Sequence, residues 1–479
     1  MTRAAFGAAA MGDPRRVRRP RTARLVLATA AVVGLLGTSG CVSVVVGRPS
    51  MQHQAPRPGD GEVTVTGAVD GSVDAQARNA LIDLETYWTE RFPDVFGQDF
   101  EPLQGGYFSV DPGDVDPRDY PRGVGCGADP REAENNAFYC QAPQSPNSDS
   151  ITYDRAFLGE LAAEHGRFLP ALVMAHEFGH AVQARVGLPD ASITTETQAD
   201  CLAGAWTAWV AAGEAPLSRL QEPELDELLR GYFLLRDPVG TSSAQESAHG
   251  SYFDRVSGFQ DGFDGGPETC RDEFGPDRVF TQGAFTRDDD LQRGGNATYP
   301  ELMDIIDVSL PTVWEQAFQD VFRDEFQPPE IEPFSDEAPA CAADPDLDLI
   351  QCADEGLVGF DEADLTRRAY QLGDFAVATA VAIPYSLAAR EQLGLPTDGE
   401  EAIRSALCLT GWYAAKVYNG QAGKDIAISP GDLDESVQFL LAYGNDPDVV
   451  PDVDLSGFQQ VDLFRAGFVQ GLAACGVGA

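Results

Sequence analysis

Val173-Met-Ala-His-Glu-Phe-Gly-His-Ala-Val-Gln183 contains an H-E-x-x-H arrangement, made of His176, Glu177 and His180, inside an otherwise apolar run. Residues four positions apart lie on one face of an α-helix, so both imidazoles can reach a single metal ion. Glu177 lies beside them and can take a proton from a water that the metal binds. Only five histidines occur in the chain, and two fall in this one turn. The alternative is a chance match on a core helix, and the pattern favours a metal site.

A catalytic zinc ion needs a third protein ligand and one open position. The next candidate is Glu196, which lies 16 residues beyond His180, enough for a helix end, a turn and a new helix. Asp200 follows one turn later on the same face, where it can accept the second N–H of a ligand imidazole and fix its orientation. The alternative is a solvated acidic pair near a helix start. We therefore expect one Zn²⁺ per chain, with His176, His180 and Glu196 as ligands.

The composition limits the possible partners and the domain organisation. At 479 residues the chain is long enough for two or more domains, and an apolar share of 43% excludes a wholly disordered chain. The formal net charge of -43 makes nucleic acid an unsuitable partner.

The N-terminus has the features of an export signal. Six arginines between Arg15 and Arg24 precede the apolar run Leu25 to Leu36, which is too short for a comfortable membrane span. The following Gly37-Thr-Ser-Gly-Cys41 resembles a bacterial lipobox. We predict a signal peptide over 1–40, lipidation of Cys41, a flexible tether over 41–75 and a location on the extracytoplasmic side of the cell membrane. The alternatives are an uncleaved anchor or an ordinary secretory signal cut nearby, which would give a secreted protein.

An internal repeat organises the rest of the chain. Residues 175–201 align without a gap on 382–408, and both stretches contain Gly-Leu-Pro and end in cysteine. Upstream, the Trp, Phe, Asp-Val-Phe, Phe and Pro of 88–102 recur in 314–328, and two further matches follow downstream in the same order. Shared helix patterning is the alternative, and tandem duplication is the better interpretation.

The duplication predicts the cysteine pairing and the fate of the second copy. Eight cysteines remain after Cys41, an even number that suits an oxidising compartment. Each copy has a close and a distant pair, which predicts four disulfides: Cys126–Cys140, Cys201–Cys270, Cys341–Cys352 and Cys408–Cys475. The second copy has apolar residues at the three ligand positions and should not bind metal; the residues aligned with His176, Glu177, His180, Glu196 and Asp200 are Ile383, Pro384, Leu387, Ile403 and Leu407.

The metal motif, followed by Glu196-Thr-Gln-Ala-Asp200-Cys-Leu-Ala-Gly-Ala-Trp206, resembles the putative neutral zinc metallopeptidase family, which has a gluzincin-type site. The likeness covers roughly 76–275 and includes His249-Gly-Ser251. It implies a zincin-like domain and zinc-dependent peptide hydrolysis, with Glu177 as base. A peptidase of this kind also needs a donor for the developing oxyanion, for which His249 is the first candidate and Tyr252 the second. We interpret His165 and His53 as bystanders.

These observations predict an α+β, predominantly helical fold with a zincin-like domain duplicated in tandem. The expected parts are a catalytic domain at 76–275, a linker at 276–300 and a degenerate domain at 301–479. The expected function is that of a zinc metallopeptidase, more narrowly a metalloendopeptidase, that hydrolyses peptide bonds of peptides or proteins outside the cytoplasm. The alternative is a non-catalytic, metal-binding envelope lipoprotein that acts as a scaffold or binding module.

Overall fold

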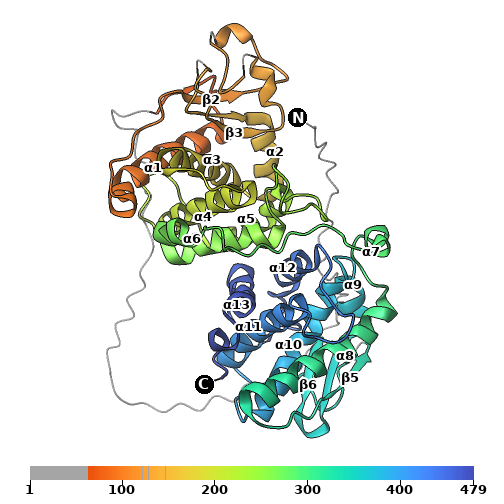
Figure 1. Ribbon diagram of the computed structural model, residues 1–479. Helices are drawn as coiled ribbons and strands as arrows, with labels where there is room; N and C mark the ends of the chain where they lie inside the picture. Colours follow the sequence, from red (N-terminus) through yellow and green to blue (C-terminus); the bar gives the residue numbers. More distant parts are fainter. Residues whose placement is uncertain are drawn as a thin grey trace, which may run out of the picture. The chain divides into compact units, whose positions relative to one another are not determined.

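The structure is a computed structural model of the chain that describes residues 63–120, 122–127, 129–145, 147–335, 337–451 and 453–478. The described residues belong to one compact unit. The predicted signal peptide, Cys41 and His53 lie outside them. As expected, the fold is α+β and predominantly helical (Figure 1).

The first half combines a four-stranded sheet with helices that carry most of its core. Its sheet has the order β1-β2-β4-β3, in which β3 runs antiparallel to β4 and the other pairs are parallel. The elements are β1 (Val65–Thr66), α1 (Ser72–Phe96), β2 (Gly106–Val110), β3 (Ala137–Cys140), β4 (Ser150–Asp154), α2 (Arg155–His165), α3 (Leu169–Val186), α4 (Ser192–Ala211), α5 (Glu222–Leu235) and α6 (Tyr252–Asp272).

The second half follows nearly the same order of elements. Its sheet, β5-β7-β6, has the strand order and directions of β2-β4-β3. After α7 (Asp288–Arg293) come α8 (Tyr299–Ala317), β5 (Glu330–Phe334), β6 (Leu349–Cys352), β7 (Leu357–Asp361), α9 (Arg367–Ala369), α10 (Asp374–Gln392), α11 (Glu400–Tyr418), α12 (Asp432–Tyr443) and α13 (Gly457–Gln470).

Helix α3, which carries the metal motif, begins near a proline and ends at a glycine. Pro170 lies in the first turn of α3, where its missing N–H costs no hydrogen bond. Gly187, with φ of 111°, ends the helix, and its N–H donates to the carbonyl of Gln183 at 2.8 Å. Between these ends most side chains are buried, so α3 packs into the core, while His176 and His180 are partly exposed.

Two segments expected to be irregular are partly ordered. Residues 63–75 were expected in the tether, but Val65 pairs with Tyr107 in the sheet and α1 already begins at Ser72. The pairing is possible because the apolar Val63 and Val65 reach the core. The linker expected at 276–300 contains α7, and Thr281 donates its N–H to Asp254 at 2.7 Å, so the segment packs on α6.

Helices α4 and α6 approach so closely that glycine is required at the contact. A side chain at Gly204 would overlap the carbonyl of Phe259, and one at Gly262 would overlap the carbonyl of Cys201. Cys201 is joined to Cys270 across the same pair of helices. In the second half, Gly411 and Gly467 meet the carbonyls of Phe464 and Cys408 in the same way, which brings α11 and α13 together.

The four disulfides of the structure are the pairs expected from the sequence: Cys126–Cys140, Cys201–Cys270, Cys341–Cys352 and Cys408–Cys475. Each joins two cysteines of the same half. None of the helices in the described ranges has an apolar run long enough to cross a bilayer.

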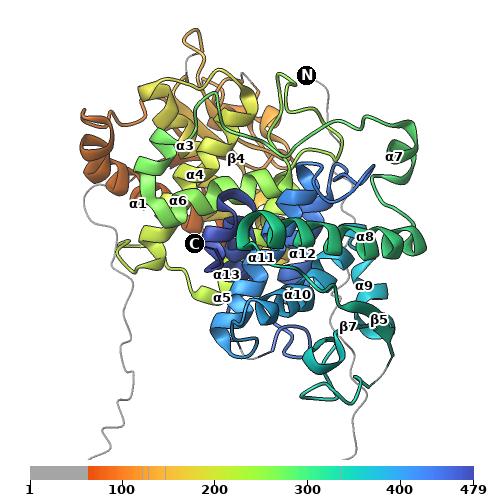
Figure 2. The same cartoon turned by 60° about the horizontal axis from the view of Figure 1, so that its bottom comes forward.

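The halves pack through α5 and α6 on one side and α12 and α13 on the other (Figure 1, Figure 2). Their contacts are reciprocal. Asp226 on α5 accepts the backbone N–H of Phe458 at 2.8 Å, at the start of α13. Asp434 on α12 accepts the N–H of Phe253 at 3.0 Å, at the start of α6. Each half therefore caps a helix of the other.

The two disulfides that close loops of different length should differ in their contribution to stability. Cys201 and Cys270 are 69 residues apart, whereas Cys341 and Cys352 are 11 apart. Loop-closure entropy predicts that replacing the first pair by alanine lowers the free energy of unfolding by about 4 kcal/mol, and replacing the second by about 3 kcal/mol. Urea denaturation of the two double variants measures the difference. An equal or larger loss for the Cys341/Cys352 variant would contradict this account.

Candidate metal centre

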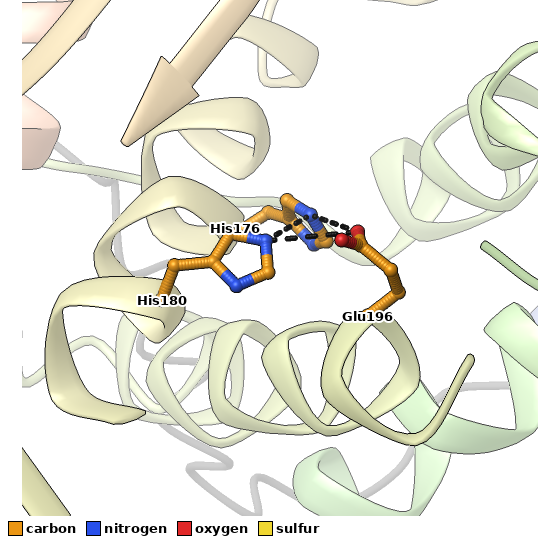
Figure 3. A group of neighbouring side chains, drawn as sticks. All are labelled: His176, His180 and Glu196. Carbon is orange, nitrogen blue, oxygen red and sulfur yellow. Dashed lines mark hydrogen bonds and ion pairs between the residues drawn. The ribbon is translucent and has the colours of Figure 1, made fainter. Parts of the chain in front are cut away.

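His176 and His180 on α3 and Glu196 on α4 point toward a common centre (Figure 3). The Nε2 atoms of the two histidines lie 3.2 Å apart. The Oε2 atom of Glu196 is 3.3 Å from Nε2 of His176 and 3.6 Å from Nε2 of His180. The structure thus brings together the three residues that the sequence indicated as metal ligands.

The three donor atoms fit a tetrahedral zinc ion. Bonds of about 2.0–2.1 Å to a tetrahedral centre place neighbouring ligand atoms roughly 3.4 Å apart, close to the separations found here. Two imidazoles and one carboxylate are also a usual donor set for catalytic zinc. The three side chains are 12%, 17% and 19% exposed, so the centre is largely buried but partly open to solvent.

Asp200 fixes the orientation of His176. Its Oδ1 atom lies 2.9 Å from Nδ1 of the imidazole, which leaves Nε2 facing the metal centre. The carboxylate is fully buried and receives two further hydrogen bonds, each 2.8 Å long, from the guanidinium of Arg255 on α6. A buried charge is tolerable only when it is paired in this way. Burial alone would raise the pKa of Asp200, but Arg255 and His176 hold it below its usual value.

His180 is oriented by a separate chain of amides. Its Nδ1 atom lies 2.8 Å from Oε1 of Gln183. The amide of Gln183 donates to the backbone carbonyl of Thr195 and to Oε1 of Gln198, at 2.8 and 2.9 Å. Gln198 in turn donates to the carbonyl of Cys270, at the end of α6, at 2.9 Å. Both histidines are therefore positioned through contacts that reach α4 and α6.

Glu177 lies beside the centre and is held by the sheet. Its Oε2 atom accepts the backbone N–H of Tyr139 on β3 at 2.7 Å. Burial raises the pKa of Glu177 above its usual value, while the positive histidines His176 and His180 oppose the shift. A carboxylate with a raised pKa is a better proton acceptor near neutral pH than an exposed one.

The two candidates for an oxyanion donor contact residues other than the three proposed ligands. The imidazole of His249 is half-exposed on the loop before α6 and contacts Asp237, at 3.0 Å. Within the described part of the chain, its ring forms a polar contact with Asp237 and none with the three proposed ligands. Tyr252 is buried and donates its hydroxyl to the carbonyl of Leu229 at 2.7 Å, which removes it as a candidate. His165 lies in the last turn of α2, where its Nε2 atom is 3.8 Å from Oε2 of Glu164.

Arg255 and Gln183 are the supporting residues that the sequence analysis missed. The internal repeat contains a signal for Arg255, because the offset of 205 between Phe259 and Phe464 aligns it with Gln460, which donates to the carbonyl of Gly444 at 2.7 Å. The arginine is thus replaced in the half where Leu407 stands at the place of Asp200. Only the structure shows that Arg255 and Asp200 form an ion pair.

Replacing Asp200 by Asn should weaken zinc binding without removing a ligand. The amide cannot hold the imidazole and the guanidinium as the carboxylate does, so we expect zinc affinity to fall by about 10- to 100-fold. Competition with a chromophoric chelator measures the change. Asp190→Asn is the matched control, since Asp190 is exposed on the loop between α3 and α4. Equal zinc affinity in wild type and Asp200→Asn would refute the positioning role.

Comparison with known proteins places the site in a family. Residues 2–274, more than half of the chain, match the family described as "Putative neutral zinc metallopeptidase". An uncharacterized protein of Mycobacterium tuberculosis (strain H37Rv) is 26% identical over 172 residues, which cover 31% of this chain and 58% of the relative. The chain thus spans somewhat more than half the length of that relative.

The uncharacterized protein YpfJ of Escherichia coli (strain K12) is 28% identical over 290 residues, which cover 55% of this chain and 91% of the relative. No solved structure matches the chain. The matched family region contains the three ligand residues, Glu177, Asp200 and Arg255. The chain therefore belongs to the putative neutral zinc metallopeptidase family.

Proposed function

We propose that the protein is a zinc-dependent endopeptidase that acts outside the cytoplasm. The observation that carries the proposal is the position of Glu177, a buried carboxylate directly beside the three ligands and held by Tyr139. A site that served only to bind metal would not need a further acidic group with a raised pKa beside its three ligands.

The residues of the site can share the work of hydrolysis. When bound, zinc supplies Lewis-acid chemistry, lowering the pKa of water and polarising a carbonyl group. Glu177 accepts the proton of the attacking water and passes it to the leaving amine. Asp200 and Gln183 keep the two imidazoles in the required orientation, which limits the reorganisation needed during the reaction.

The sheet offers a place for an extended peptide beside the centre. Strand β3 lies at the edge of its sheet, and β4 is its only strand partner among the described residues. An exposed edge can pair with an extended chain through backbone hydrogen bonds. Because Glu177 contacts Tyr139 on this strand, a peptide bound along the edge would pass next to the base. This arrangement favours cleavage within a chain.

Glu177→Gln should abolish hydrolysis while leaving zinc bound. The amide is nearly the same size but cannot accept the proton, so we expect kcat/KM to fall by about 10²- to 10⁴-fold. Zinc content and cleavage of a quenched-fluorescent peptide library measure the two properties. Glu164→Gln is the matched control, because Glu164 is exposed on α2.

The alternative function, a non-catalytic metal-binding scaffold, predicts a different result. Zinc would be bound stoichiometrically, but the wild type would cleave no peptide faster than Glu177→Gln does.

We also propose that the second half is a degenerate copy of the first. Equivalent aromatic pairs support this duplication: Phe168 stacks on Trp206 with ring centroids 5.9 Å apart, and Phe375 stacks on Tyr413 at 6.4 Å. All four positions are related by the offset of 207. The shared strand order, the two glycine contacts and the distant disulfide in each half support it further.

The second half has kept part of the supporting network without the site. Ser405, at the place of Gln198, donates to the carbonyl of Cys475 at 2.7 Å, as Gln198 does to that of Cys270. Ile383 and Ile403 are buried where His176 and Glu196 would stand. We propose that this half lost its zinc site and serves as a packing partner for the first.

We propose that Cys41 anchors the protein to the outer side of the cell membrane. Four disulfides support an oxidising compartment. Cys41→Ser should prevent lipidation and release the protein from the membrane fraction. Labelling with a radioactive fatty acid, followed by cell fractionation, tests this expectation. An unlabelled wild type, or a variant that remains in the membrane fraction, would argue against a lipid anchor at this residue.

A further inference from the structure

A second cluster of carboxylates lies in the half without the zinc site. Asp374 begins α10, and Asp432 and Glu435 lie in the first turn of α12. One oxygen of each comes within 4.8 Å of the others. All three residues are more than nine-tenths buried.

Each of these carboxylates uses one oxygen to accept a backbone N–H. Asp374 accepts from Ala297 at 2.6 Å, Asp432 from Ser429 at 2.8 Å, and Glu435 from Phe375 at 2.8 Å. The Oδ1 atoms of Asp374 and Asp432 are buried, and neither has a hydrogen-bond partner in the described part of the chain. Buried acceptors without partners are costly, so these two oxygens require a ligand.

The nearest positive side chains do not neutralise the cluster. Arg287 pairs with Asp290 at 2.8 Å, and Arg293 pairs with Glu301 at 3.0 Å. When all three carboxyl groups are ionised they carry a charge of about -3, and the N-termini of α10 and α12 contribute roughly +0.5 each. The cluster then keeps a net charge of about -2, which one divalent cation would neutralise.

In the first half, an arginine side chain lies at the position that corresponds to Asp374. Glu227 lies against Gly166 there, as Glu435 lies against Gly373 in the second half. Arg167 follows Gly166 and pairs with Glu224 at 2.6 Å. Asp374 follows Gly373, so an acidic residue stands where the first half has the arginine. At this position the second half has a third carboxylate, whereas the first half has an exposed arginine.

The cluster is accessible through a cavity of about 370 Å³ that Asp374, Asp432 and Tyr413 help to line. This volume has room for an ion and for the waters that complete its coordination. The donors are all oxygen atoms, which hard cations prefer over zinc. Separations within 4.8 Å suit Ca–O distances of about 2.3–2.6 Å. Burial raises the pKa of all three carboxyl groups, to about 6 for Asp374. The neighbouring acids raise these pKa values further, because their negative charges are close together.

We propose that Asp374, Asp432 and Glu435 bind a calcium ion that stabilises the second half by joining α10 to α12. The site is separate from the zinc centre and does not rest on the proposed peptidase activity.

Calcium titration of the full-length, zinc-loaded protein tests the proposal. After removal of calcium, isothermal titration with CaCl₂ should show one site per chain, and calcium should raise the melting temperature. Terbium should bind in the same place and be sensitised by Tyr413, which lines the cavity. Asp432→Asn should lower calcium affinity at least tenfold. Asp454→Asn, an exposed position in the same half, is the matched control and should bind like wild type.

Asp374→Arg restores the arrangement of the first half and provides a second test. The variant should bind no calcium, and in calcium-free buffer it should melt at a higher temperature than the wild type. The Asp374→Arg variant tests for the calcium site even if the Asp432→Asn variant does not fold. The proposal would be overturned if millimolar calcium neither bound to the wild type nor raised its melting temperature. Unchanged calcium binding in both variants would also overturn it. Binding of the organic cation spermidine in place of calcium would also overturn it.

Discussion

The close contact between α4 and α6 is the constraint on which the zinc centre depends. Gly204 and Gly262 let the two backbones meet, and the disulfide Cys201–Cys270 joins the helices. Only at this distance can Arg255 on α6 form its ion pair with Asp200 on α4. Asp200 then orients His176, and Glu196 on the same helix meets both histidines. A side chain at either glycine would separate the helices and disturb a ligand, its partner and the buried ion pair together.

The second half supports this contact from outside. Asp434 caps the start of α6 by accepting the N–H of Phe253, two residues before Arg255, and also pairs with Arg236 at 3.2 Å. The capped helix and the ion pair fix the position of Arg255 relative to α4. A half that has no zinc ligands thus contributes to the geometry of the zinc centre, which gives a physical reason for a chain to retain it.

The two halves differ in how their buried carboxylates are neutralised. In the first half the buried acid Asp200 is neutralised by Arg255, and Glu196 faces the two histidines. In the second half the residues that align with the ligands are apolar, and a group of acids lies where the starts of α10 and α12 meet. Burial of charge always needs a counter-charge, whether from a side chain, a helix terminus or an ion. The position of each carboxylate therefore indicates what must bind beside it.

The sequence by itself determined the local features of this protein. The spacing of His176 and His180 in an apolar run indicated a helix on which they share a face. Paired cysteine spacings indicated all four disulfides. Only the tertiary structure decided which distant side chains meet. Arg255 is 55 residues from Asp200, and Tyr139 is 38 residues from Glu177. Such contacts follow from the packing of whole elements, on which local spacing places no constraint.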